Sequence, residues 1–250
     1  MRMEKLRVKT RAFCTVLLLT LPLMALADET VVDGGFLAGM NTSGVSSRFN
    51  EYDNLLGGQG GFWLKIGKKW FQVETGLEYS YRANKFEQIS EVGVLGDPST
   101  LQTQKYSVRS SSHHITFPLS IAFGFWPNND CGESRDGDFI GVSVSGGGYV
   151  DVGVAGTIKA KGSCVFQPYG STQSDMQLGP VSTGLYGSDS YQQKRFDYGW
   201  QVGLIFGVGT VFRIGATYRH GLANLSNLPD YKITNRCLMV NIMFSFFADN

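Results

Sequence analysis

Bulky apolar residues alternate with small or polar ones along several stretches of the chain. In the stretch FQVETGLEYSYR, at 71–82, the odd-numbered positions are Phe, Val, Thr, Leu, Tyr and Tyr, whereas the even-numbered ones are Gln, Glu, Gly, Glu, Ser and Arg. A period of two places the two sets on opposite faces of a β-strand. The same alternation predicts eight strands, at 32–41, 60–66, 71–82, 114–125, 140–157, 196–207, 212–219 and 238–246.

The composition of the two faces indicates which of them meets water. In each predicted strand one face is a belt of Phe, Val, Leu and Ile with almost no charge, and the other face is small or charged. A soluble sandwich instead buries its large residues and covers its outer face with Lys, Glu and Thr. Eight bulky faces are more apolar surface than one sandwich interior holds, so we expect these faces to meet lipid.

The connections between the predicted strands agree with a membrane barrel. With the N-terminus periplasmic, the periplasmic turns fall at 67–69, 126–139 and 209–211, and the external loops at 42–58, 84–112, 159–194 and 222–234. Short turns on one side and long loops on the other are typical of outer-membrane barrels. Aromatic residues near the strand ends predict interfacial girdles. The sequence thus predicts an all-β fold, an eight-stranded antiparallel up-and-down transmembrane β-barrel.

The N-terminal segment predicts export. Five basic residues precede the apolar run TVLLLTLPLMALA, which ends in the small-x-small sequence Ala25-Leu26-Ala27. This is the pattern of a secretory signal peptide cleaved after Ala27, and the run is too short for a lasting transmembrane helix. We therefore expect a signal peptide at 1–27 and one barrel domain at 28–250, located in the outer membrane of a Gram-negative bacterium.

Composition excludes some classes of protein. The chain has 32 glycines and 7 prolines with 13% aromatic residues, which fits many strands and tight turns rather than a collagen-like or disordered chain. Cleavage of the signal peptide removes five of the 22 basic residues and one of the 21 acidic residues. The mild negative balance that remains argues against nucleic-acid binding.

Five stretches of the mature chain carry a resemblance to a known family: GFWLKIGKKWFQVETGLEYSYR, HHITFPLSIAFGF, FDYGWQVGLIFGVG, FRIGATYRHGLANLSN and NRCLMVNIMFSFF. They resemble the PorT-like outer-membrane β-barrel family over most of the mature chain. The resemblance implies a small barrel that meets chaperones in the periplasm and is folded into the outer membrane by the barrel-assembly machinery. Some relatives serve a secretion apparatus, so the resemblance also implies an accessory role in a secretion or surface assembly.

Charged residues on the inward faces of the strands predict an ion-pair network. An eight-stranded barrel is just filled by its side chains, so charges of both signs in its interior should pair with one another and close it. No nucleophile stands beside a base in this set, and we predict no catalytic, metal or cofactor site. The predicted network consists of Lys65, Glu74, Glu78, Arg82, Asp151, Asp197, Arg213 and Arg219, and His114 shares their face.

The histidines raise the alternative of an enzyme. His113 and His114 are adjacent on one strand and point to opposite faces, so they cannot bind one ion together. His113 and His220 fall on the lipid side near the external rim, where small barrels resembling lipid A deacylases place a catalytic His. Neither of them begins a His-x-Ser pair, and we expect both to be interfacial polar side chains.

Three cysteines remain after cleavage, and they should meet an oxidising compartment. Cys164 and Cys237 both fall on the external side of the predicted barrel. A disulfide between them, tying the largest loop to the last strand, is a hypothesis, because spacing alone does not give connectivity. Cys131 lies on the periplasmic side, across ~25 Å of membrane, and would stay unpaired or bond another protein.

The leading interpretation is a non-enzymatic outer-membrane barrel that displays long surface loops. Two alternatives remain: a barrel that uses its loops for adhesion or ligand binding, and, less favoured, an enzyme that modifies lipid. The expected partners are outer-membrane lipid, the periplasmic chaperones and assembly machinery, and a protein at the external loops. No nucleic acid and no cofactor are expected.

Overall fold

The computed structural model describes residues 31–47, 53–68, 70–94, 97–125, 140–167, 174–189, 192–208, 211–228 and 232–248. The predicted signal peptide, the turn at 126–139 and Cys131 lie outside these residues. Within these ranges, no helix has the length and hydropathy needed to cross a membrane. The described strands are β1 (Val31–Ser47), β2 (Asp53–Lys68), β3 (Phe71–Val94), β4 (Asp97–Phe125), β5 (Ile140–Gln167), β6 (Ser174–Gly184), β7 (Phe196–Val208), β8 (Phe212–Gly221) and β9 (Ile233–Ala248).

Eight of these strands close into a ring, because each of them pairs with two neighbours. The order around the ring is β1, β2, β3, β4, β5, β7, β8 and β9, and β9 pairs with β1. Every pairing is antiparallel. Closure satisfies the backbone hydrogen bonds that an open sheet edge would expose. The prediction of an eight-stranded antiparallel barrel is confirmed.

The two faces of the barrel strands differ as the alternation predicts. Large apolar side chains on the outward face are exposed, Phe62 by 55% and Phe117 by 52%, and all eight strands of the ring carry such residues. The inward face instead buries polar side chains completely, among them Lys65, Thr116 and Asp151. A protein dissolved in water would show the reverse. The barrel therefore spans a membrane, with the bulky face towards lipid.

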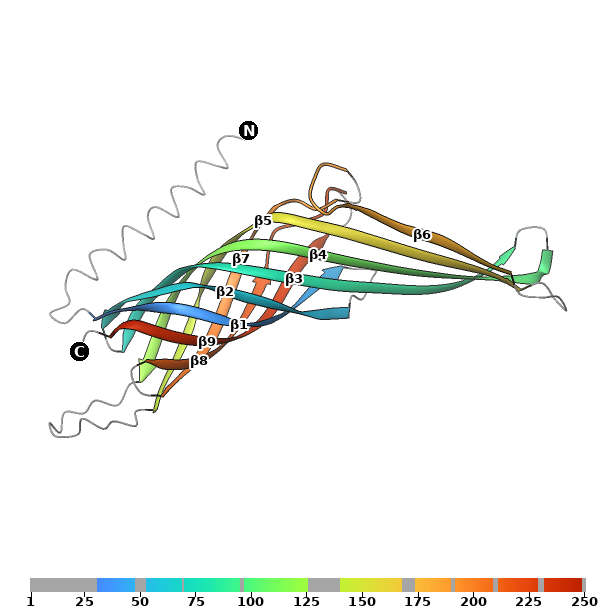
Figure 1. The fold of residues 1–250 in the computed structure, drawn as a ribbon. Helices are drawn as coiled ribbons and strands as arrows, with labels where there is room; N and C mark the ends of the chain where they lie inside the picture. The colour runs from blue at the N-terminus through green and yellow to red at the C-terminus, as the bar shows by residue number, and fades with distance from the viewer. Residues whose placement is uncertain are drawn as a thin grey trace, which may run out of the picture.

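Three barrel strands continue beyond the ring and, together with β6, form a four-stranded sheet that we call the arm. The arm consists of residues 84–94 of β3, 97–112 of β4, 156–167 of β5 and all of β6. β6 pairs only with β5 and stays outside the ring. Figure 1 shows the arm extending from one end of the barrel, whereas β1 begins and β9 ends at the opposite end.

The arm corrects the prediction of loops at 84–112 and 159–194, since most of these residues are in strands. Pairing of β3 with β4 runs from the barrel into the arm, so that Tyr81 lies opposite His113 and Lys85 lies opposite Arg109. The sequence pattern does not reveal these strands because their bulky residues change from the outward to the inward face beyond His113. The outward positions there are Ser, Lys and Arg, as in a loop.

Small residues inside the barrel make room for large ones. Tyr149 on β5 lies opposite Gly199 on β7, and a Cβ added at Gly199 would lie 2.9 Å from the Tyr149 ring. Near the end at which β1 begins, four inward side chains pack into an apolar cluster, which consists of Leu37, Trp63, Ile205 and Met243.

Candidate functional site in the barrel interior and at its mouth

Ion pairs form between residues of the predicted interior network. Lys65 Nζ lies 3.4 Å from Glu74 on the adjacent strand, and both oxygens of Asp151 on β5 accept hydrogen bonds from the Arg82 guanidinium at 3.1 and 3.3 Å. Arg82 and Asp151 are almost completely buried. Bidentate pairing in a buried site fixes both side chains, because each charge would be costly to leave unpaired.

A third pair crosses the whole lumen. Arg219 on β8 lies 2.8 Å from Glu78 on β3, and these two strands are diametrically opposite in the ring. Arg219 Nε also donates to Gln201 at 2.8 Å, and Gln201 donates to Ser120 on β4 at 2.7 Å. Side chains from β3, β4, β7 and β8 therefore meet in the middle of the barrel and occupy the space that a channel would need.

The fourth cation of the network has a partner that sequence reasoning missed. Arg213 forms an ion pair with Asp33, near the start of β1, and its guanidinium lies 4.9 Å from the centre of the Trp63 ring. Ser245 also donates to Asp33 at 2.9 Å. The signal was present in the alternation, because position 33 has the same parity as the small inward residues of the first predicted strand.

Asp197 lies in the interior, but it does not form the ion pair that the predicted network assigns to it. Among the described residues no cation lies within ion-pair distance of it, and its carboxylate accepts a hydrogen bond from Tyr149 Oη at 3.2 Å. The backbone N–H of Tyr198 donates to its other oxygen at 2.9 Å. A phenol and an amide, rather than an arginine, satisfy this buried carboxylate.

Ser112, His114 and Asp151 are linked in an order familiar from hydrolases. Ser112 Oγ lies 2.9 Å from His114 Nε2, and His114 Nδ1 lies 2.7 Å from Asp151 Oδ2. Because Asp151 accepts, we assign the ring proton to Nδ1, which leaves Nε2 to accept from Ser112. A catalytic serine needs such a base and orienting acid, together with access for the substrate and donors for an oxyanion.

The surroundings of this group favour a structural role. Asp151 is already held by Arg82 and accepts from Thr116 Oγ1 at 2.5 Å. Tyr186 Oη lies 3.1 Å from the same His114 Nε2 that Ser112 contacts. The hydroxyl of Ser112 therefore competes with a phenol for its base, and Ser112 itself is buried. The group joins β3, β4, β5 and the segment after β6 at the barrel mouth.

The segment between β6 and β7 covers this mouth. Leu185 N donates to Gly156 O at 2.9 Å, and Gly153 N donates to Arg195 O at 2.7 Å, so both ends of the segment are tied to β5. Burial raises the pKa of Tyr186 to about 12, so its phenol stays protonated and available to donate. A small pocket remains below the segment, lined by Arg82, Asn84, Ser110, Ser112, His114, Leu185, Tyr186, Gln193, Lys194, Arg195, Asp197, Leu225 and Asn235.

The two outward histidines belong to the aromatic girdle. His113 Nδ1 lies 2.6 Å from Tyr79 Oη, and the His220 ring stacks on Trp200 with centroids 5.4 Å apart. This is the environment expected of interfacial side chains. The part of the chain that the structure describes has no group of three or more His, Cys, Asp or Glu residues placed to hold a metal ion.

The predicted disulfide between Cys164 and Cys237 is not formed. Cys237 is a free, buried cysteine on the inward face of β9, opposite Arg219 and Ser43. Cys164 pairs with Gln104 and Met176 in the arm, beyond the ring. The prediction was wrong because it treated residues 159–194 as a loop free to fold back, whereas the strand pairing of β5 holds Cys164 away from the barrel.

No protein-family model matches the chain, and no curated protein sequence matches it. Solved structures similar to the fold include Ail, the attachment invasion locus protein of Yersinia pestis, with 15% identity, a TM-score of 0.31 and coverage of 86% of this chain and 98% of that chain. Neisserial surface protein A has 11% identity, a TM-score of 0.28 and coverage of 85% and 97%. The translocator domain of autotransporter NalP from Neisseria meningitidis has 8% identity, a TM-score of 0.24 and coverage of 95% and 98%. The chain is thus similar to outer-membrane barrels of several kinds.

Proposed function

We propose that the protein is a non-enzymatic outer-membrane barrel, closed to ions, that holds its arm at the cell surface to bind a protein partner. The observation that carries this proposal is an inversion of polarity between the barrel and the arm. In the barrel the outward face is apolar and the inward face polar, whereas in the arm the outward face carries cations and the inward face carries apolar residues, with polar ones such as Gln104 and Ser110 beside them.

The inner face of the arm consists of residues that share rows across its strands. Val108 on β4, Ala160 on β5 and Val181 on β6 lie side by side, and Tyr106 and Ile158 occupy neighbouring rows of the same face. Val181 is 65% exposed and Tyr106 is 42% exposed. Exposed apolar and aromatic residues on a rigid sheet outside the lipid are typical of protein–protein contact surfaces.

The orientation of the arm follows from the barrel. β1 begins and β9 ends at the end opposite the arm (Figure 1). Barrels of this kind place their short turns in the periplasm and their longer segments outside the cell, which directs the arm outwards. The resemblance to the PorT-like family adds a secretion or surface assembly as the kind of partner.

Site-specific photo-crosslinking in intact cells tests the proposal. We expect a photoreactive residue at Tyr106 or Val181, on the inner face, to give a crosslinked protein product. The matched controls lie on the outward face: Ser107 on β4, next to Tyr106, and Thr157 on β5, the strand that pairs with β6. Neither control should give such a product. Absence of a product from all four positions would contradict partner binding by the arm. A product that forms only after cells of a second kind are added would favour the adhesion alternative.

A further inference from the structure

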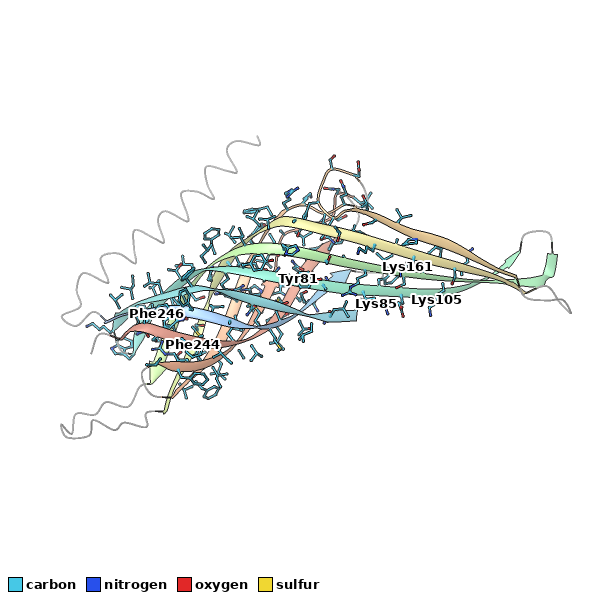
Figure 2. The ribbon with its side chains drawn as sticks, viewed as in Figure 1. Tyr81, Lys85, Lys105, Lys161, Phe244 and Phe246 are labelled. Atoms are coloured by element: carbon cyan, nitrogen blue, oxygen red, sulfur yellow. The ribbon has the colours of Figure 1, made fainter. Side chains whose placement is uncertain are left out.

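We propose that the outward face of the arm binds the phosphate groups of lipids in the outer leaflet of the membrane. Five cationic side chains gather on this face, and we call them the basic band: Lys85, Lys105, Arg109, Lys159 and Lys161. Figure 2 shows Lys85, Lys105 and Lys161 on the arm, beyond Tyr81 and far from Phe244 and Phe246 at the other end of the barrel.

The strand register brings these cations together. Lys85 on β3, Arg109 on β4 and Lys159 on β5 lie in one row across three adjacent strands. Lys161 is two residues further along β5 than Lys159, and Lys105 is four residues from Arg109 on β4. Neighbouring strands are about 4.8 Å apart and alternate residues about 7 Å apart, so the band covers a patch about 10 Å by 15 Å.

Within the described residues, a carboxylate pairs with one cation of the band, Lys85, and the other four form no ion pair. Among its described outward neighbours the carboxylate is Glu87, which pairs with Lys85 at 2.7 Å, and this hydrogen bond lowers the pKa of Glu87. Asp53 lies opposite Lys85 in the register, at the edge of the band. Within the described residues no ion pair involves Arg109, Lys159 or Lys161. Like charges placed directly across strands repel, so an anion bound between them would stabilise the sheet.

The band lies where lipid headgroups are. On β4 it begins four residues beyond His113, which is part of the aromatic girdle together with Tyr79 and Tyr81. Four residues are about 13 Å along a strand, or about 10 Å along the membrane normal for a strand tilted by about 40°. The outward face is apolar below the girdle and cationic above it, which is the order of hydrocarbon and phosphate in a leaflet.

The side chains suit phosphate rather than a neutral headgroup. The Arg109 guanidinium offers a planar fork for two phosphate oxygens, and the lysines around it supply mobile point charges. Basic residues just outside the hydrocarbon region bind anionic lipid surfaces in this way. The inference is independent of the proposed partner binding, because it concerns the opposite face of the arm.

Binding of purified full-length protein in nonionic detergent to lipid A tests the inference. The probes are bisphosphorylated lipid A and the same lipid with both phosphates removed. We expect the wild type to bind the bisphosphorylated form at least about tenfold more tightly, and the double variant Arg109→Gln/Lys161→Gln to lose most of this preference. The matched control Lys194→Gln/Lys232→Gln removes two exposed cations elsewhere and should retain it.

Additional variants and competitors make each outcome of the experiment decisive. Lys161→Arg keeps the charge and should bind as the wild type does, while an unchanged heat-dependent gel shift checks that each variant is folded. Inorganic pyrophosphate in excess should weaken lipid binding only modestly, because the aromatic girdle also contacts the bound lipid. Equal binding of both lipids by the wild type, or unchanged preference in Arg109→Gln/Lys161→Gln, would overturn the inference. Binding of a sulfated polysaccharide that pyrophosphate abolishes, with no preference between the lipids, would assign the band to a soluble polyanion and also overturn it.

Discussion

Arg219 connects opposite walls of the barrel, so its removal should lower the stability of the whole barrel. In Arg219→Met the carboxylate of Glu78 stays buried without its partner, which lies 2.8 Å away in the wild type. Leaving such a charge unpaired costs about 3–5 kcal/mol of unfolding free energy. We expect a loss of this order in urea unfolding of the barrel in detergent. Lys161→Met removes an exposed cation of the arm and should change the free energy of unfolding by less than about 0.5 kcal/mol.

The double variant Glu78→Met/Arg219→Met separates the pair from the space that it fills. Replacing a buried ion pair by apolar side chains of similar volume is often neutral, so the double variant should recover most of the lost stability. If it were as unstable as Arg219→Met, the charge left on Glu78 would not be the cause of the loss.

The hydroxyl of Ser112 should not act as a nucleophile. Its hydroxyl shares His114 Nε2 with Tyr186, and Arg82 and Thr116 engage the carboxylate behind His114. We therefore expect no labelling of the folded protein by a fluorophosphonate probe, and Ser112→Ala to cost only about 1 kcal/mol of stability for the lost hydrogen bond. Labelling that disappears in Ser112→Ala would revive the interpretation as an enzyme.

Along β4 the same face stays outward from the hydrocarbon into the arm, which allows a matched pair of substitutions. Leu119→Arg places a cation on the outward face between Phe117 and Ile121, both exposed to the hydrocarbon. The expected cost is roughly 2–4 kcal/mol near the middle of the membrane. Ser107→Arg puts the same side chain on the same face of the arm and should fold as the wild type does. The measurement is the fraction of protein that reaches the heat-resistant form in lipid vesicles, and equal fractions would contradict the assignment of faces.

The elements also show how far the sequence leads. Alternation gives all eight strands of the ring and their lipid-facing sides, because in a bilayer the two faces meet opposite solvents. It fails in the arm, where Tyr106 and Val108 point inwards and Lys105 and Arg109 outwards, since both faces there are outside the hydrocarbon. The alternation does not predict β6 either, because β6 pairs only with the arm portion of β5, outside the hydrocarbon.

The interior illustrates the same limit for side chains. The sequence predicts which residues face inwards, and Lys65, Glu74, Glu78 and Arg219 do pair. It does not predict which of them meet, because partners such as Glu78 and Arg219 lie on opposite strands whose approach depends on the diameter and stagger of the ring. The bond between Asp197 and Tyr149 depends on the space at Gly199.

For the whole molecule, closure of the ring should appear in electrophoresis. All eight strands of the ring pair with two neighbours, so the ring has no edge from which detergent could open it. We expect the folded protein to fractionate with outer membranes and to migrate faster on gels before heating than after it. Purification as a water-soluble monomer without detergent would contradict the transmembrane barrel.

The filled interior of the same closed barrel should make it electrically silent. Arg219 and Glu78 meet across the lumen, Arg213 and Asp33 join near the end at which β1 begins, and the segment after β6 covers the opposite mouth. An ion would have to displace paired charges at several levels, each pair costly to separate in a poorly hydrated space. We therefore expect no steady conductance when the wild type is reconstituted into planar bilayers. Arg219→Met removes the contact across the lumen and should give at most brief, small openings, since Arg213, Lys65 and Arg82 keep their partners. Large and stable openings in the wild type would instead identify the protein as a porin, with an interior that water enters and an arm that stands at the rim of a channel.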